Sequence, residues 1–356
     1  MRVHMTTRHV RNAPRGFSLI ELMVGIVIGL IAVLVIYQVY SAAEGIRRNT
    51  TSVGDAQQNG LLSSFMLQIE LANASNGVAY AIKELGTCPS TGNMSTTFRP
   101  IPVLINYGGN DATPDSFVVN YSAAQRVVAP VPFAANAAAG APYFVQSPTG
   151  FKPGDLVVAI SMAGNCAASR VTAVGAPDVN GVVTLTHTGA PVSFTSDAVL
   201  LNLGPKDSGQ RVAYDVDVVK NVLRSTALWN DNGAPGANAP NPIAPNIVNM
   251  KLLYGIDNGG GGVIWTQPTG AWSAASVHAA SISTLNKIRA VRIGIVVRGE
   301  QCDKTLGDYT WTLFEAPVQA TGTIPAPAPA CGIGNYRYRI YETTIPLRNP
   351  IWNPIS

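Results

Sequence analysis

The sequence predicts an α+β protein, with one long N-terminal helix followed by a large β-rich region. Residues 17–40 are almost wholly apolar, and residues 41–73 contain no proline and keep a helical spacing of apolar positions. Beyond residue 76 the apolar period changes to two, as in β-strands. The chain contains 47% hydrophobic and only 12% charged residues, which excludes an intrinsically disordered protein.

The apolar segment 17–40 is long enough to cross a membrane, and it contains one carboxylate, Glu21. As a helix it spans about 36 Å, more than the roughly 30 Å hydrocarbon core of a bilayer. A charged side chain inside the membrane costs about 2.5–3.5 kcal/mol, so Glu21 indicates a functional site with a partner. The nearest candidate is an amine at Phe17, which a cut after Gly16 would create.

Three interpretations of this segment are open. A secretory signal peptide would be cut near Ser41-Ala42-Ala43, but its apolar run is usually about 7–15 residues, and Glu21 interrupts the start of this one. A plain single-pass anchor has no use for Glu21. Cleavage on the cytoplasmic side, between Gly16 and Phe17, keeps the helix on the mature chain and explains all the parts together.

The leader 1–16 carries the basic excess of the chain. It holds Arg2, Arg8, Arg11 and Arg15 and no acidic residue, as expected on the cytoplasmic side of a membrane segment. The remaining 20 basic residues balance the 20 acidic ones. The net charge of +4 therefore does not indicate nucleic-acid binding, and we do not expect nucleic acid as a partner.

The run Gly16-Phe17-Ser18-Leu19-Ile20-Glu21 resembles the processing signature of the type IV prepilin family, Gly-Phe-Ser/Thr-Leu-Ile-Glu, without departure. The resemblance implies that a prepilin peptidase cuts between Gly16 and Phe17 and methylates the Phe17 amine. It also implies that Glu21 pairs with the Phe17 amine of a neighbouring subunit during assembly. Such a pair would offset part of the cost of both charges in lipid.

Residues 41–75 continue the helix as an amphipathic segment, which we expect to stop at Asn76-Gly77. We expect this second half of the helix to cover a β-sheet. The expected apolar stripe consists of Leu61, Leu62, Phe65, Met66 and Ile69, and the expected polar face of Gln57, Gln58, Ser63, Ser64 and Gln68.

The β-rich part divides near Pro205 into an inserted region, 76–205, and a C-terminal sheet domain, 206–356. Pro346 places the last strand at a sheet edge or at its own end. Loops rich in Ala, Pro, Gly and Asn are expected at 129–142, 230–245 and 323–329. The expected strands are 117–121, 155–161, 170–174, 181–187, 198–203, 211–219, 222–226, 246–257, 288–298, 309–314 and 337–347.

Three C-terminal segments sharpen the resemblance. Residues 247–257, 288–298 and 338–349 look like strands of PilW-type minor pilins. The resemblance implies a type IV pilin-like fold, in which a long N-terminal helix with a membrane-spanning first half packs on an antiparallel β-sheet. The stretch 85–205 resembles no family.

The four cysteines, Cys88, Cys166, Cys302 and Cys331, are widely spaced. In an exported chain they predict up to two disulfides, with three connectivities open. We favour Cys88–Cys166 and Cys302–Cys331 because they are close in sequence; four unpaired thiols are the alternative. The close-spaced pairs usual in zinc sites are absent from the sequence.

The sequence contains no catalytic motif, so we expect no enzyme, no cofactor and no metal. His187 falls in an expected strand and His278 in an expected loop, and we interpret both as ordinary surface or packed histidines. Asp257-Asn258 precedes four glycines but lacks the acidic ligands of a calcium loop. For Asp215 and Asp217 we favour solvated carboxylates.

A group of arginines in the C-terminal half could contact DNA or an acidic partner, but we favour salt-bridged sheet surface. The group consists of Arg289, Arg292, Arg298, Arg337, Arg339 and Arg348.

By the resemblance, the chain is a minor pilin that primes type IV pilus assembly, stays near the tip, and supports twitching motility and adhesion. Its implied partners are other minor and major pilins, the prepilin peptidase, the inner membrane and a tip adhesin. It would span the bacterial inner membrane once before assembly and lie in the extracellular pilus afterwards. The alternatives are a minor pseudopilin of type II secretion and a non-polymerising, membrane-anchored periplasmic binding module.

Overall fold

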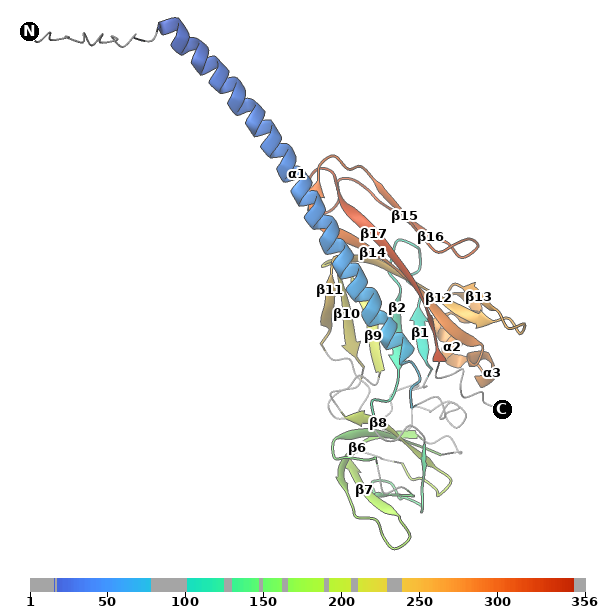
Figure 1. Cartoon of the computed structure of the whole chain (residues 1–356). Helices are drawn as coiled ribbons and strands as arrows, with labels where there is room; N and C mark the ends of the chain where they lie inside the picture. Colours follow the sequence, from blue (N-terminus) through green and yellow to red (C-terminus); the bar gives the residue numbers. More distant parts are fainter. Residues whose placement is uncertain are drawn as a thin grey trace, which may run out of the picture. The chain divides into compact units, whose positions relative to one another are not determined.

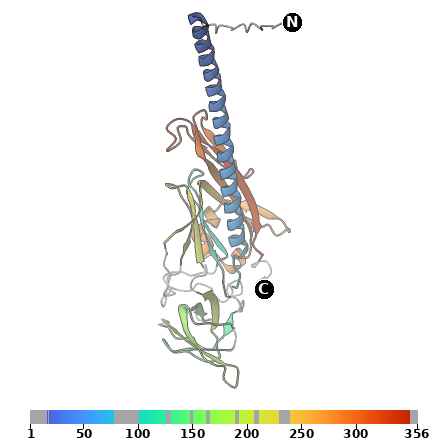
Figure 2. The same ribbon diagram turned by 60° about the vertical axis from the view of Figure 1, so that its left-hand side comes forward.

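The computed structural model describes residues 16, 18–77, 101–124, 130–146, 150–161, 166–188, 192–205, 211–228 and 239–348. It divides the chain into two compact units, 1–51 and 52–356. Helix α1 (Leu19–Ala72) is 54 residues long, with residues 19–51 in the first unit and 52–72 in the second. The prediction of one long helix is thereby confirmed. The strands of the described part all belong to the second unit (Figures 1 and 2).

An antiparallel sheet of four strands lies at the centre of the second unit. Its order is β13 (Val263–Thr266), β12 (Ile247–Asp257), β14 (Ile288–Asp303) and β17 (Asn335–Pro346). The near-continuous apolar runs of β12 and β14 match strands that are covered on both faces. One face joins the core that contains α1, and the other carries the hairpin β15 (Tyr309–Leu313)–β16 (Ala320–Ile324).

A second antiparallel sheet shares the core with α1. Its order is β1 (Val103–Asn106), β2 (Ser116–Asn120), β9 (Arg211–Asp217), β10 (Val222–Ala227) and β11 (Asn241–Pro245). Leu67 and Leu71 of α1 are fully buried between the two sheets. The hydroxyl of Tyr254 on β12 accepts a 2.7 Å hydrogen bond from the backbone N–H of Ile105 on β1. Strands β1 and β2 fall within the expected inserted region 76–205, and β2 pairs with β9.

Six short strands form a small closed barrel. Their order is β3 (Val131–Pro132), β8 (Val199–Pro205), β5 (Asp155–Ile160), β6 (Cys166–Val174), β7 (Val183–Thr188) and β4 (Tyr143–Val145). A bridge between Phe133, next to β3, and Val145 of β4 joins the two ends of this sheet. The rings of Phe133, Tyr143 and Phe194 fill the interior.

Short helices connect β13 to β14: η2 (Gly270–Trp272), α2 (Ala274–Ala279) and α3 (Ile282–Leu285). The hydroxyl of Ser273 caps α2 by accepting a hydrogen bond from the backbone N–H of Ser276. His278 therefore lies in a helix, and the expectation that it lies in a loop is wrong.

One buried ion pair fixes a loop to the central sheet. The Lys251 ammonium on β12 lies 3.0 Å from the Asp115 carboxylate, and each side chain is only 2% exposed. The ammonium also donates 2.7 Å hydrogen bonds to the carbonyls of Asn110 and Thr113. The carboxylate accepts further bonds from the backbone N–H groups of Gly108 and Leu252. The loop before β2 is thus held by a fully hydrogen-bonded pair of buried charges.

Every expected strand has a counterpart in the structure, and six further strands were not expected. β11 lies in the expected loop 230–245, β3 in the expected loop 129–142, and the end of β16 in the expected loop 323–329. β11 contains two prolines and tolerates them because it is an edge strand. β1, β4 and β13 are only three or four residues long.

Candidate assembly surface on helix α1

Glu21 lies in the first turn of α1. The helix begins after Ser18, whose carbonyl accepts hydrogen bonds from the backbone N–H groups of Glu21 at 3.0 Å and Leu22 at 3.1 Å. The partial positive charge at a helix N-terminus favours a carboxylate in this turn. Gly16 is exposed, and Phe17 lies outside the described residues.

The first half of α1 displays its apolar side chains on all sides. From Leu19 to Tyr40 the large apolar residues are more than half exposed within the chain. α1 is the one helix of the described part that is long and apolar enough to cross a membrane. The segment therefore offers Glu21 and its apolar neighbours to lipid or to another protein.

The second half of α1 packs on the sheets through a seam that consists of four small residues followed by two leucines. Its buried positions are Ser52, Ala56, Gly60, Ser63, Leu67 and Leu71. They recur every three or four residues and therefore share one face of the helix. Small side chains at every fourth position from Ser52 to Gly60 are the sequence signal for this seam, a signal that the search for large apolar residues misses.

The expected apolar stripe points away from the sheets. Phe65 is 61% exposed and Leu61 55%, whereas Leu67, which belongs to the seam, is fully buried. The second half of the helix covers the sheets, as expected, but it does so through another face than this apolar stripe, and Ser63, which was expected on the polar face, is fully buried. The complete exposed stripe consists of Leu61, Leu62, Phe65, Met66 and Ile69.

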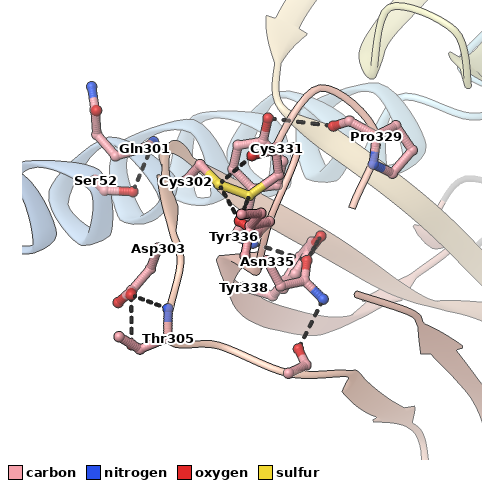
Figure 3. Close-up of a disulfide and its surroundings, with 12 residues drawn as sticks. Ser52, Gln301, Cys302, Asp303, Thr305, Pro329, Cys331, Asn335, Tyr336 and Tyr338 are labelled. Carbon is pink, nitrogen blue, oxygen red and sulfur yellow. Dashed lines mark hydrogen bonds between the residues drawn. A yellow bond between two sulfur atoms is a disulfide. The ribbon is translucent and has the colours of Figure 1, made fainter. Parts of the chain in front are cut away.

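Two contacts explain why the first part of the seam, from Ser52 to Ser63, consists of small residues. The ring of Tyr341 on β17 occupies the place that a Cβ of Gly60 would take. At the other end of the seam, the Ser52 hydroxyl accepts a 3.3 Å hydrogen bond from the backbone N–H of Gln301 (Figure 3). Gly299 leaves the room for Ser52 at this bulge of β14. The backbones of helix and sheet therefore approach closely.

A disulfide lies beside the same bulge (Figure 3). It joins Cys302, near the end of β14, to Cys331, in the loop before β17, with the Cα atoms 5.6 Å apart. The predicted Cys302–Cys331 pairing is confirmed. Cys166 is a buried disulfide cysteine, but Cys88 lies outside the described residues, so the Cys88–Cys166 pairing stays a prediction.

Ion pairs account for most of the charged residues that we considered as sites. Arg224 binds Asp215 and Asp217, so these carboxylates are paired rather than merely solvated. In the arginine group, Arg289 pairs with Asp257, Arg292 with Glu342 and Arg337 with Asp303, which confirms a salt-bridged sheet surface for these three. Arg339 is exposed, and no acidic partner lies within ion-pair distance among the described residues.

His187 behaves as a packed histidine. Its ring stacks on Tyr143 with the centroids 3.8 Å apart, and Nε2 lies 2.9 Å from the Ala141 carbonyl oxygen. Burial lowers the pKa of His187. Within the described part of the chain, no three His, Cys, Asp or Glu side chains cluster as metal ligands would.

Two family models match the chain, one at each end. The model for the prokaryotic N-terminal methylation motif matches residues 11–37, which contain Gly16, Phe17 and Glu21. The model for the type IV pilus-assembly protein W matches residues 213–349, from β9 through β17. These are families of structural pilin-type proteins and not of enzymes. Neither a curated protein nor a solved structure matches the chain significantly.

Proposed function

From the two family matches, which support a PilW-type type IV pilin, we propose that this chain is a minor pilin that primes pilus assembly and stays near the tip. One observation supports this function most strongly. The methylation-motif match falls on an exposed apolar helix that carries Glu21 in its first turn. The helix anchors the pilin in the membrane before assembly.

Processing creates the partner of Glu21. Cleavage between Gly16 and Phe17 leaves an N-terminal amine four residues before the carboxylate, and the Phe17 amine of a neighbouring subunit would pair with it. In lipid each charge alone is costly, so pairing favours addition of the subunit to a filament end. Other pilins are therefore the proposed partners of the first half of α1.

The second half of α1 supports an assembly role as well. Its seam holds the helix to the protein's own sheets, which leaves the stripe Leu61, Leu62, Phe65, Met66 and Ile69 exposed. Contiguous exposed apolar surface is unfavourable in water and typical of protein contacts. The second unit, with three sheets and a hairpin, is bulky, which suits a low-copy subunit near the tip, in support of twitching motility and adhesion.

Mass spectrometry of sheared surface filaments tests location and processing together. We expect a methylated peptide that begins at Phe17. A mature chain that begins at Ser41 or later, or one that keeps its leader, would instead favour a non-polymerising periplasmic module. Co-purification with secretion-platform proteins in place of pilus proteins would favour a pseudopilin of type II secretion.

Substitution of Glu21 tests the pairing. We expect Glu21→Ala to be cleaved and membrane-inserted but to reach filaments at about a tenth of the wild-type level or less, if pairing contributes 1.4 kcal/mol or more. Glu44→Ala is the matched control, because Glu44 is a carboxylate of the same helix that pairs with Arg48 within the chain. Equal incorporation of wild type and Glu21→Ala would contradict the proposed role.

A further inference from the structure

β17 is the longest strand at a sheet edge in the described part. β17 has 12 residues and pairs on one side only, with β14. Its proline, Pro346, comes at the very end. An unpaired edge of this length presents a row of backbone N–H and C=O groups that another strand can bind.

The other edge strands in the described part are shorter, and β15 and β16 have five residues each. β1 and β13 have four residues each, and β11 carries Pro242 and Pro245. The barrel closes on itself through the bridge between Phe133 and Val145. Short strands, prolines and closure are the usual means of preventing edge pairing. β17 has none of these devices along its length.

A cleft of about 280 Å³ runs along this edge. It is lined by four consecutive β17 residues, Tyr336 to Arg339, together with Val53 of α1 and Leu306 and Tyr309 from the hairpin side. Successive residues of a strand point to opposite faces of its sheet. A cleft that touches four in a row must therefore follow the edge of the strand and not one face.

The chemistry of the cleft is aromatic and cationic. Tyr309 stacks on Tyr338 with the ring centroids 4.6 Å apart, and burial raises the pKa of Tyr338 to about 12, so this wall is uncharged at neutral pH. Arg337 and Arg339 supply positive charge on the other face of the strand.

The two guanidinium groups have donors to spare. Asp303 binds one end of Arg337 at 2.8 Å, but the buried Nε of Arg337 lacks a hydrogen-bond partner within the described residues. Arg339 is exposed and lies within ion-pair distance of no carboxylate that the structure describes. The Arg337 side chain as a whole is 38% exposed, so a carboxylate that entered the cleft would bind Arg339 and the exposed part of the Arg337 guanidinium.

We propose that the edge of β17 binds an extended, acidic segment of a partner protein, which adds as a further antiparallel or parallel strand to the sheet. Backbone hydrogen bonds would supply affinity, as in other cases of strand addition. A glutamate or aspartate of the segment would bind Arg337 and Arg339, and an apolar side chain would lie against Tyr309 and Tyr338. The cleft shares only Val53 with α1 and includes neither Glu21 nor the exposed stripe, so the proposal does not depend on the chain's assembly into a filament.

A peptide-binding experiment on the full-length chain in detergent tests the proposal. The probe is a short fluorescent peptide that alternates valine with glutamate, and its partner probe carries lysine in place of glutamate. We expect the glutamate peptide to bind at least about tenfold more tightly than the lysine peptide, because of charge complementarity. We also expect it to slow hydrogen exchange of the backbone amides of residues 335–341.

Charge reversal at the edge identifies the site. Arg339→Glu should lower the affinity for the glutamate peptide by about tenfold or more, and it should raise the affinity for the lysine peptide. Lys220→Glu is the matched control, because Lys220 is an exposed cation on the turn after β9, and it should leave both affinities unchanged. Arg339→Gln gives a milder second variant with the same direction of change. Unchanged thermal unfolding would show that each variant is folded.

Several results would overturn the proposal. One is equal affinity for the two peptides, or no binding of either. Another is binding without protection of residues 335–341, which would mean that no strand is added. A third is preferential binding of a single-stranded oligonucleotide through Arg339, which would assign the cations to nucleic acid. If neither peptide binds, or both bind equally, the arginines serve only to keep the β17 edge from pairing with another strand.

Discussion

The ring of Tyr341 on β17 lies directly against Gly60 of α1, in the space that any larger residue at position 60 would need. The Tyr341 hydroxyl also donates a 3.4 Å hydrogen bond to the carbonyl of Gln57, one turn earlier in the helix. This contact sets how closely the helix approaches the four-stranded sheet. The side of α1 that carries Gly60 therefore packs on the sheet, and the side that carries Phe65 remains exposed.

Gly60→Ala should therefore destabilise the protein although alanine is the better helix former. Overpacking of a close contact costs about 1–3 kcal/mol, more than the roughly 1 kcal/mol that alanine gains in a helix. Gly54→Ala in the same helix has open space around the added methyl and should stabilise instead. Denaturant unfolding of the detergent-solubilised chain measures both. In a Tyr341→Ala background the effect of Gly60→Ala should change sign; the same destabilisation there would refute the contact.

The two faces of α1 should respond to substitution in opposite ways. Phe65→Glu changes an exposed residue and should alter the free energy of unfolding by no more than about 0.5 kcal/mol, while it lowers recovery of the chain in sheared filaments. Leu67→Ala empties a fully buried site and should cost about 2–5 kcal/mol. Comparable destabilisation by both would mean that the stripe packs on the protein's own sheets.

The buried pair Lys251–Asp115 should be sensitive to loss of one partner. Lys251→Met leaves the Asp115 carboxylate buried without its cation and should cost about 3–5 kcal/mol. Arg289→Met is the matched control, because Arg289 and Asp257 are each 30% exposed and such pairs contribute about 0–1 kcal/mol. Chemical unfolding at neutral pH measures both variants. A cost for Lys251→Met as small as that of Arg289→Met would show that water reaches Asp115.

The loss of folding stability at low pH, called the acid limb below, should depend on Asp303. A hydrogen bond from the Thr305 hydroxyl, and then bonds from the Thr305 backbone N–H and Arg337, hold the pKa of Asp303 below its usual value. A lowered pKa means that the folded state binds fewer protons, so this stabilisation is present above the ordinary carboxyl pKa of about 3.9 and is lost as pH falls through the folded pKa.

Asp303→Asn should consequently flatten the loss of stability below about pH 4 and reduce stability at neutral pH. Thr305→Val, which removes the largest cause of the shift, should act in the same direction but less strongly. Thermal unfolding as a function of pH follows both variants. An acid limb identical to that of the wild type would rule out Asp303 as one of its origins.

The sequence predicts which segments become elements better than it predicts what each face contacts. The absence of proline and the apolar spacing predict α1 to within a few residues of its observed ends, Leu19 and Ala72. The same spacing cannot tell whether an apolar stripe meets the protein's own sheet or a partner. Here the large side chains such as Phe65 are left outside, and small ones such as Ala56 make the internal contact.

The missed strands have local causes as well. β11 carries prolines that argue against a strand, and only its place at a sheet edge makes them tolerable. β1 is too short for a period of two to stand out. The Cys302–Cys331 bridge followed from proximity in sequence, whereas the open cleft beside β17 depends on strand order, which the sequence does not reveal.

The Cys302–Cys331 bridge has a mechanical consequence. It ties together two positions 29 residues apart, and the loop between them contains the whole β15–β16 hairpin. If a molecule were stretched by its two ends, that loop could not lengthen while the sulfurs stay joined. The extended length of the chain would be shorter by about 100 Å, at roughly 3.5 Å for each extended residue of the loop. Under tension, the oxidised chain would therefore gain less length on unfolding than the reduced chain. The β15–β16 hairpin would bear none of the applied force.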